Sequence, residues 1–345
     1  MDPSGAFRPS YDQVLPGPAP GPAPDRRPGS VRRTSHLDAT RGEGSGFMGV
    51  VAIAGAARDL QTGPDGYQVL GEASLVVGIG PDGLIDRVHA TPSGTGVEAL
   101  VGHRIGFGFR SSVKELLTEL SGSLLGLLVD DLSGAPAPSG YGAIRDRVLL
   151  GLPDPPMPPM PEGARRGATQ TDVCAGWRAG GVPTTARQTG MPMPFEAEPP
   201  VAPDLTVGDP VAWHAMGPLG GGQSRRVRRM DLWREGEVLV VDAMFRDSTV
   251  DPDLTQRVVH EYALSAQLDP ATLSILDIDA EPRSLPFPTD CPLAADSARL
   301  ILGQPVAGLR ESVRTLSAGP VSCTHLNDAM RSLADMATLA AHLAA

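Results

Sequence analysis

The feature that most constrains this chain is a long segment rich in proline, glycine and methionine near its middle. Residues 151–223 include the run Pro-Asp-Pro-Pro-Met-Pro-Pro-Met-Pro at 153–161. Proline lacks the backbone N–H group and breaks helices and strands, so the proline run is not expected to continue a regular element. We expect a linker or a packed strap that separates two patterned regions, residues 31–150 and 224–345. The Pro/Gly-rich residues 1–30 are predicted to be a disordered tail.

Each patterned region is predicted to form strands followed by helices. Alternating apolar residues or short apolar runs predict three strands in each region, at 50–56, 72–78 and 84–90, and at 237–247, 258–268 and 272–280. Helical spacing of apolar residues then predicts amphipathic helices, at 111–120, 291–302, 309–316 and 325–343. The order of strands before helices favours the α+β class.

The two regions look like copies of one another. Arg58-Asp59 matches Arg246-Asp247, and Gly71-Glu72 matches His260-Glu261. Further matches follow in the same order at a nearly constant offset. We therefore predict an α+β protein of two tandem duplicated units, each a three-stranded antiparallel sheet with helices packed on it.

The comparison of the two copies distinguishes residues expected to be structural from residues expected to serve a function. His260, Cys291, Cys323 and His325 occur only in the second copy. The places of His260, Cys323 and His325 in the first copy are taken by Gly71, Gly126 and Leu128. Since the first copy is predicted to fold without these four residues, the second copy does not need them for its fold. This raises the expectation that they serve a function.

The chemistry of the four side chains suits a metal site. His260 is predicted to point inward from the apolar face of its strand, while Cys291 and Cys323 begin helices. A helix N-terminus favours the thiolate, which is the form that binds metal. Two Cys and two His suit zinc, and His325 is predicted as the fourth ligand. The spacing leaves open a nucleophilic Cys with a His partner, and buried inert thiols.

Three polar neighbours are candidate catalytic residues. Tyr262 is a candidate proton donor, and Glu261 and Asp328 are candidate acid/base groups. Both carboxylates recur in the first copy, so a purely structural role is the alternative for them. The leading function is a zinc-dependent enzyme, a lyase, isomerase or hydrolase, that acts on a small molecule by Lewis-acid or metal-bound-water chemistry. The alternatives are a zinc or iron–sulfur carrier module without turnover, and a structural protein with inert thiols.

Composition limits the classes of binding partner and the cellular compartment that we expect for this protein. The net charge of -11 argues against nucleic acid as a partner, and the short basic run at 225–229 reads as a solvated strand start. Three cysteines do not make a disulfide framework. The N-terminus lacks a secretory signal, and the longest apolar runs are too short to cross a bilayer. We expect a cytoplasmic protein without a membrane span; its oligomeric state is not predicted.

The chain resembles a bacterial family of unknown function (domain of unknown function 2889). The resemblance rests on residues 240–248, His260-Glu-Tyr262, the box Ser322-Cys-Thr-His-Leu-Asn-Asp328 and the box Cys174-Ala-Gly-Trp177. It extends over most of the chain after Val31 and implies no activity.

A more distant similarity is to iron–sulfur scaffold proteins of the NifU/IscU type. It rests on Cys291-Pro-Leu-Ala-Ala-Asp-Ser297 and on the box that contains Cys323 and His325. The resemblance implies that His260, Cys291 and Cys323 are metal ligands, with an iron–sulfur cluster as the alternative to zinc. His260 stands in place of a cysteine and Tyr262 in place of an aspartate, and these departures fit a permanent zinc better than transient cluster assembly.

Overall fold

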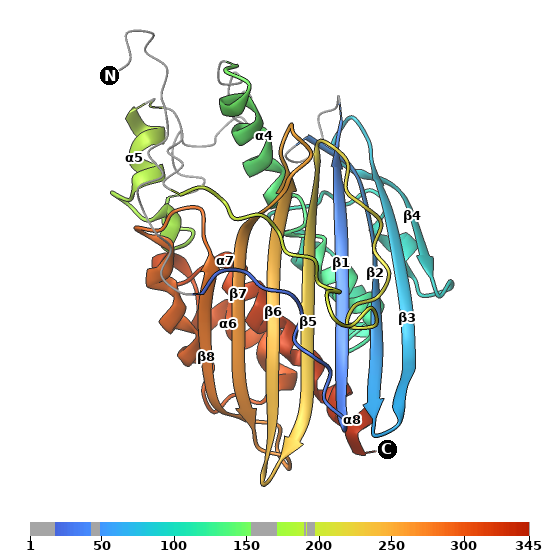
Figure 1. Cartoon of the computed structure of the whole chain (residues 1–345). Coiled ribbons are helices and arrows are strands. Elements are labelled where there is room, and N and C mark those ends of the chain that lie inside the picture. Colours follow the sequence, from blue (N-terminus) through green and yellow to red (C-terminus); the bar gives the residue numbers. More distant parts are fainter. Residues whose placement is uncertain (1–17, 43–48, 153–170, 190, 192–196, 345) are drawn as a thin grey trace.

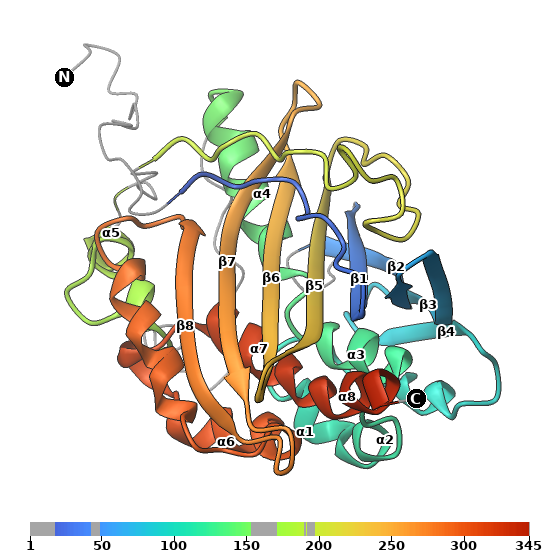
Figure 2. The ribbon, with the colours of Figure 1, turned by 60° about the horizontal axis from the view of Figure 1, so that its bottom comes forward.

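The chain forms one eight-stranded antiparallel sheet with helices packed on one face (Figure 1). The computed structural model describes residues 18–42, 49–152, 171–189, 191 and 197–344. Figure 2 shows α3, α7 and α8 along the helix-covered face. Extended segments of the chain cross the opposite face (Figure 1).

The strands of the two regions meet at the centre of the sheet. The first region supplies β1 (Ser30–Arg41), β2 (Val50–Gly63), β3 (Gly66–Ile79) and β4 (Ile85–Thr91). The second region supplies β5 (Gln223–Glu235), β6 (Val238–Val250), β7 (Gln256–Leu268) and β8 (Ile275–Ser284). Their order is β4-β3-β2-β1-β5-β6-β7-β8, so β1 and β5 are neighbours.

This arrangement corrects the prediction of two separate three-stranded units. β1 pairs with β5 from Ser30 opposite Trp233 to Thr40 opposite Gln223, and the eight strands share one sheet. The predicted strands exist, but β1 and β5 were missed. Both strands carry arginines on each face, which hides the alternation of apolar and polar residues. The basic run at 225–229 is accordingly buried in β5 rather than solvated.

Helices follow the strands in both regions. After β4 come η2 (Val97–Leu100), α1 (Phe109–Ser112), α2 (Lys114–Glu119), α3 (Leu124–Asp131) and α4 (Ala137–Leu149). The middle segment contains η3 (Ala175–Trp177) and α5 (Val182–Thr189). After β8 come η4 (Cys291–Ile301), η5 (Val306–Gly308), α6 (Leu309–Leu316), η6 (Gly319–Val321), α7 (Thr324–Ser332), η7 (Leu333–Asp335) and α8 (Met336–Ala344).

The predicted helices are confirmed in position but not always in form. The helix predicted at 309–316 is α6, with the predicted bounds. The one predicted at 325–343 is divided by η7, and the one at 111–120 is divided at Val113. The segment predicted as a helix at 291–302 is the 3-10 helix η4.

Apolar side chains fill the space between helices and sheet in two main clusters. The cluster of the second region includes Phe245, Tyr262 and Leu326, and that of the first includes Leu75 and Leu128. Burial of such side chains contributes roughly 1.5–3 kcal/mol each, which makes these clusters the main source of stability.

Between the two apolar clusters lies a network of buried charges, here called the central ion network. Arg33 on β1 binds Asp59 on β2 with two hydrogen bonds of 2.7 Å, and Arg226 on β5 binds Asp247 on β6 with two of 2.9 Å. Buried charges are tolerated only when they are paired, and this network contains equal numbers of both signs. Its described members are Arg33, Arg110, Arg226, Arg228, Arg310, Arg331, Asp59, Asp130, Asp131, Asp247, Asp328 and Asp335.

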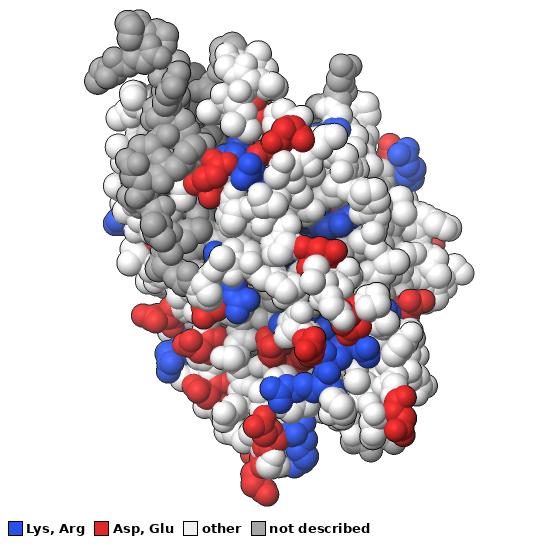
Figure 3. Space-filling model, in the orientation of Figure 1, with Lys and Arg blue, Asp and Glu red and all other residues white. Residues whose placement is uncertain are grey.

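The opposite face of the sheet is crossed by two covering segments, residues 18–29 and 197–222 (Figure 1). Arginines of the sheet hold them by donating to their backbone carbonyls: Arg246 to Gly21, Arg32 to Ala212 and Arg225 to Gly217. Residues 18–29, the end of the tail predicted to be disordered, thus pack on the sheet. Figure 3 views this face, where positive and negative side chains are interspersed.

Candidate metal centre

The three cysteines of the chain converge on one buried place, although they come from three separate segments. Cys174 precedes η3, Cys291 begins η4, and Cys323 is the N-cap residue of α7; all three are buried free thiols. A Cβ atom added to Gly176 would lie 2.7 Å from Cys291 Sγ and 3.9 Å from Cys174 Sγ. Glycine at 176 therefore allows the backbone to approach the sulfur of Cys291.

Local contacts tie the three segments together. Asp290, directly before Cys291, accepts hydrogen bonds from Arg178 Nε at 2.8 Å and from the Val182 N–H at 2.9 Å. The Ala175 N–H donates to the carbonyl of Ser322 at 2.7 Å. The carboxylate of Asp290 thus anchors the segment that carries Cys174.

Two histidines stack on one another, and one of them lies beside a thiol. The rings of His260 on β7 and His325 on α7 stack, with centroids 3.6 Å apart and an interplanar angle of 16°. His325 Nδ1 lies 3.9 Å from Cys323 Sγ, and His325 Nε2 lies 3.5 Å from Asp247 Oδ2. His325 therefore stands between the thiol and the carboxylate.

Tyr262 completes what we call the thiol cluster, together with Cys174, Cys291, Cys323 and His325. Its hydroxyl faces the Cys323 thiol, yet it finds no hydrogen bond of good geometry in the described part of the chain. A buried hydroxyl without a partner costs roughly 1–3 kcal/mol, so a ligand that accepts or donates here would relieve that cost.

Burial keeps the cluster uncharged. It raises the pKa of Cys323 to about 12 and that of Cys291 well above its usual value, and nearby thiols add to both shifts. Burial lowers the pKa of His325 to about 3 and that of His260 well below its usual value. At neutral pH the site thus holds neutral imidazoles, which are ready to ligate, and thiols that must release protons to do so.

Two of the predicted catalytic residues, Glu261 and Asp328, are engaged in ion pairs with arginines. Glu261 points to the opposite face of the sheet, where its Oε2 accepts from Arg246 Nε at 2.5 Å. Asp328 belongs to the central ion network, where Arg110 and Arg226 donate to it at 2.8 and 3.0 Å. These guanidinium groups hold the pKa of Asp328 far below its usual value. The structural alternative is therefore the better account of both carboxylates.

The structure brings Cys291, Cys323 and His325 together, with His260 stacked on the last. No group of three or more His, Cys, Asp or Glu among the described residues stands in a geometry that could hold a metal ion. The metal role of these four residues thus stays a prediction.

Cys174 is the member of the cluster that sequence reasoning missed. It had been assigned to the linker or strap because proline and glycine surround it. The one available signal was the Cys174-Ala-Gly-Trp177 box, which differs from the repetitive sequence on either side.

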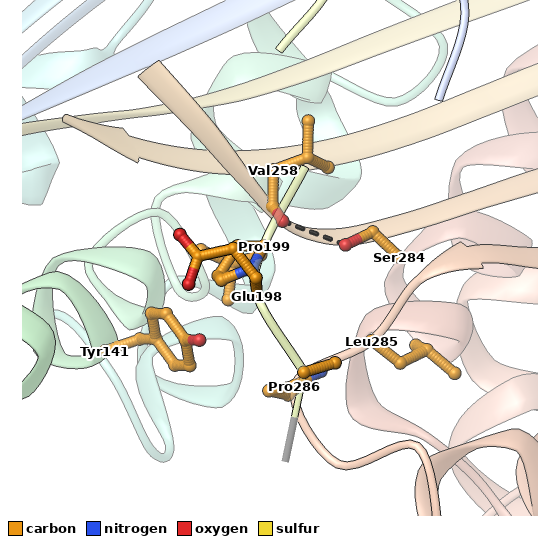
Figure 4. Close-up of a pocket in the computed structure, with 9 residues that line it drawn as sticks. Tyr141, Glu198, Pro199, Val258, Ser284, Leu285 and Pro286 are labelled. Atoms are coloured by element: carbon orange, nitrogen blue, oxygen red, sulfur yellow. Dashed lines mark hydrogen bonds between the residues drawn. The ribbon is translucent and has the colours of Figure 1, made fainter. Parts of the chain in front are cut away.

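A shallow surface depression lies near the start of β7 (Figure 4). Tyr141, Glu198 and Pro286 line it, and the Ser284 hydroxyl on its wall donates to the Val258 carbonyl at 2.8 Å. The carboxylate of Glu198 is already paired with Arg145. No cysteine or histidine lines this depression, so it adds nothing to the thiol cluster.

Comparison with known proteins identifies a family for one part of the chain. Residues 224–339 match the family described as "Protein of unknown function (DUF2889)". This match covers the second region, from β5 into α8. No curated protein and no solved structure matches the chain, so the wider extent of the resemblance and the similarity to iron–sulfur scaffolds stay predictions. Among the described helices, none has the length and apolarity required to traverse a bilayer.

Proposed function

We propose that the thiol cluster binds a soft divalent metal ion, zinc in the first instance, and that this centre carries the function of the protein. The observation behind the proposal is the convergence of all three cysteines of the chain on one buried place, beside a histidine. Three sulfurs and one nitrogen are a common tetrahedral donor set for zinc. The proposed donors are Cys174, Cys291, Cys323 and Nδ1 of His325.

One distance and the charge state of the cluster support this donor set. In tetrahedral zinc sites a sulfur and a nitrogen ligand lie about 3.6 Å apart, given Zn–S and Zn–N bonds of about 2.3 and 2.0–2.1 Å. Cys323 Sγ and His325 Nδ1 lie 3.9 Å apart, so a small shift would suffice for this pair, while the four donors together would have to move into a tetrahedral arrangement on binding. The thiols are held neutral because burial disfavours the thiolate. A divalent cation supplies the charge that makes thiolates stable there.

The proposal extends to metal-dependent chemistry on a small molecule. When bound, zinc supplies positive charge that polarises a ligand or lowers the pKa of a bound water. Tyr262 would then hydrogen-bond the ligand through its unpaired hydroxyl, and His260 would hold the ring of His325 by stacking. Four protein donors close a tetrahedral site, so turnover requires one donor to give way to substrate. A carrier or structural role for the metal requires no such exchange.

The first test is the metal content of protein purified under reducing, metal-replete conditions. About one zinc ion per chain is expected in the natural protein. Cys174→Ala, Cys291→Ala and Cys323→Ala should each lose most of it. Cobalt substitution gives a second reading, since thiolate-to-cobalt absorption bands report how many sulfurs ligate.

The matched control is Ala298→Ser on η4, which places a hydroxyl at another buried position of the same core without removing a donor. It should retain the zinc of the natural protein. Iron together with sulfide would favour the carrier alternative. Absence of any metal from the replete natural protein would refute the proposal.

A second candidate function is a cysteine nucleophile. Cys323, His325 and Asp247 lie in the order of nucleophile, base and orienting carboxylate, with separations of 3.9 and 3.5 Å. This arrangement predicts that iodoacetamide modifies Cys323 faster than Cys174 or Cys291, and that His325→Gln abolishes the difference. Equal and slow modification of the three thiols, measured by mass spectrometry, would reject it. The raised pKa of Cys323 favours that slow outcome.

A further inference from the structure

We infer that Asp247, held in place by Arg226, is the positioning residue that orients His325 for metal binding. This inference rests on the proposed function, since it assigns a role toward the same metal. Histidines that ligate metals generally donate their other ring N–H to a carboxylate, which fixes the tautomer and the ring orientation. The described geometry supplies such a carboxylate on the side of the ring away from the thiols.

The two ring nitrogens of His325 face different partners. Nδ1 lies 3.9 Å from Cys323 Sγ, and Nε2 lies 3.5 Å from Asp247 Oδ2. A neutral imidazole carries its single proton on one nitrogen or the other. Ligation through Nδ1 places that proton on Nε2, where it faces the carboxylate. The carboxylate thus favours the tautomer that leaves Nδ1 free for the metal.

Asp247 itself is fixed by its neighbours. It is fully buried, and Arg226 donates to its two oxygens at 2.9 Å each. A third nitrogen of Arg226 donates to Asp328 at 3.0 Å, which ties the guanidinium to α7. His260, directly opposite Asp247 in the pairing of β6 with β7, stacks on the His325 ring. The His325 ring is thus contacted at its edge by Asp247 and on one face by His260.

The first region contains the same ion pair without the histidines. Arg33 binds both oxygens of Asp59, and a third nitrogen of Arg33 donates to Asp335 at 2.9 Å. The residue opposite Asp59 is Gly71, where the second region has His260. Asp59 therefore has the same structural role as Asp247 but has no proposed metal ligand to orient. A substitution at Asp59 is the matched control for one at Asp247.

The decisive experiment compares Asp247→Asn with Asp59→Asn in the full-length chain. Zinc affinity is measured by competition with a chelator, and stability by urea unfolding of the metal-free proteins. We expect both variants to lose similar stability, and only Asp247→Asn to weaken zinc binding, by about 10–100-fold. Equal zinc affinities in the two variants would overturn the inference and leave Asp247 with a structural role alone.

A second measurement does not depend on zinc. Nitrogen-15 spectra of histidine-labelled, metal-free protein distinguish the two neutral tautomers of each ring. His325 should be in the Nε2–H form in the natural protein and in Asp59→Asn, and should shift toward a mixture in Asp247→Asn. An unchanged tautomer would overturn the inference. If the natural protein bound no zinc, the proposed function would fail, while these spectra would still decide whether Asp247 positions His325.

Discussion

The two regions of the sheet carry the same ion pair in the same register but differ in what surrounds it. Arg33 stands opposite Asp59 in the pairing of β1 with β2, as Arg226 stands opposite Asp247 in that of β5 with β6. In the first region the next residue across is Gly71, and in the second it is His260. A register shift follows Asp59 in one case and Asp247 in the other.

The difference shows how a site is added to an existing scaffold. Around Asp59 the neighbouring positions are small or apolar: a Cβ added to Gly71 would meet only Leu124, at 3.6 Å. Around Asp247 the corresponding space holds His260 and His325, with Cys323 beyond them. The ion pair thus occurs in both regions, while His260 and His325 are present only in the second. The family match covers this second region.

The largest effect is expected from removing the arginine of either ion pair. Arg226→Met leaves the buried Asp247 without its arginine, while Asp328 keeps Arg110. Arg33→Met leaves the buried Asp59 without its arginine, while Asp335 keeps Arg310. Breaking a buried pair in this way costs about 3–5 kcal/mol. We expect both variants to lose this much free energy of unfolding in urea titrations. A loss in one variant only would show that the two ion pairs are not structurally equivalent.

A pH effect of intermediate size is expected where the regions meet on the other face. His36 on β1 and His214 in a covering segment share a 2.6 Å hydrogen bond, and Thr34 bonds His214 at 2.8 Å. Burial lowers the pKa of His36 to about 4 and that of His214 to about 3. Both folded pKa values lie below the unfolded value, so folding favours the neutral rings. Their contribution is complete above about pH 6.5 and is lost as the pH falls toward about 3.

The measurement is the free energy of unfolding between about pH 7 and about pH 4. Charged groups around the pair are Asp38, Arg225 and Arg58, which stay unchanged in the variants. The double variant His36→Asn/His214→Asn should show a flatter pH dependence than the natural protein. His89→Asn, on the exposed side of β4, is the control and should leave the slope as it is. An unaltered slope in the double variant would contradict the prediction.

The smallest effects are expected at the position where the two regions differ. His260→Ala removes a ring stacked on His325 and should cost about 1–3 kcal/mol. Gly71→Ala adds a methyl group that meets Leu124 at ordinary contact distance, so its effect should stay within about 1 kcal/mol and tend to stabilise. Thermal unfolding of the two metal-free variants tests this. A large loss from Gly71→Ala would mean that the first region requires glycine for its own packing.

The fold was predictable where apolar patterns carry it. The strands around Leu75 and Leu264 and the helix α6 follow the spacing of their apolar residues. β1 and β5 were hidden because arginines such as Arg33 and Arg226 occupy buried positions that ordinarily hold apolar side chains. Their partners lie far away in the sequence, so only the folded chain shows that these charges are paired. Without these two strands, the two regions could not be joined into one sheet.

The site was predictable in part for a similar reason. Cys291, Cys323 and His325 stood out because they begin helices, and the structure brings them together. Cys174 reaches them across a distance in sequence that no local pattern encodes. Glu261 follows His260 directly, and since neighbouring strand residues face opposite sides, it lies on the far face of the sheet.

The pairing of β1 with β5 has a consequence for the order in which the molecule can form. About 200 residues separate the paired positions Ser30 and Trp233, and this pairing is the only strand contact between the two regions in the described sheet. Contacts between such distant residues form slowly, because a long loop must close first. During synthesis β1 is therefore complete long before β5 leaves the ribosome. In that interval the arginines of β1 lack the carboxylates of the second region with which they pair in the folded chain. Until β5 arrives, β1 is an open edge at which a nascent chain can pair with a neighbour instead of with itself.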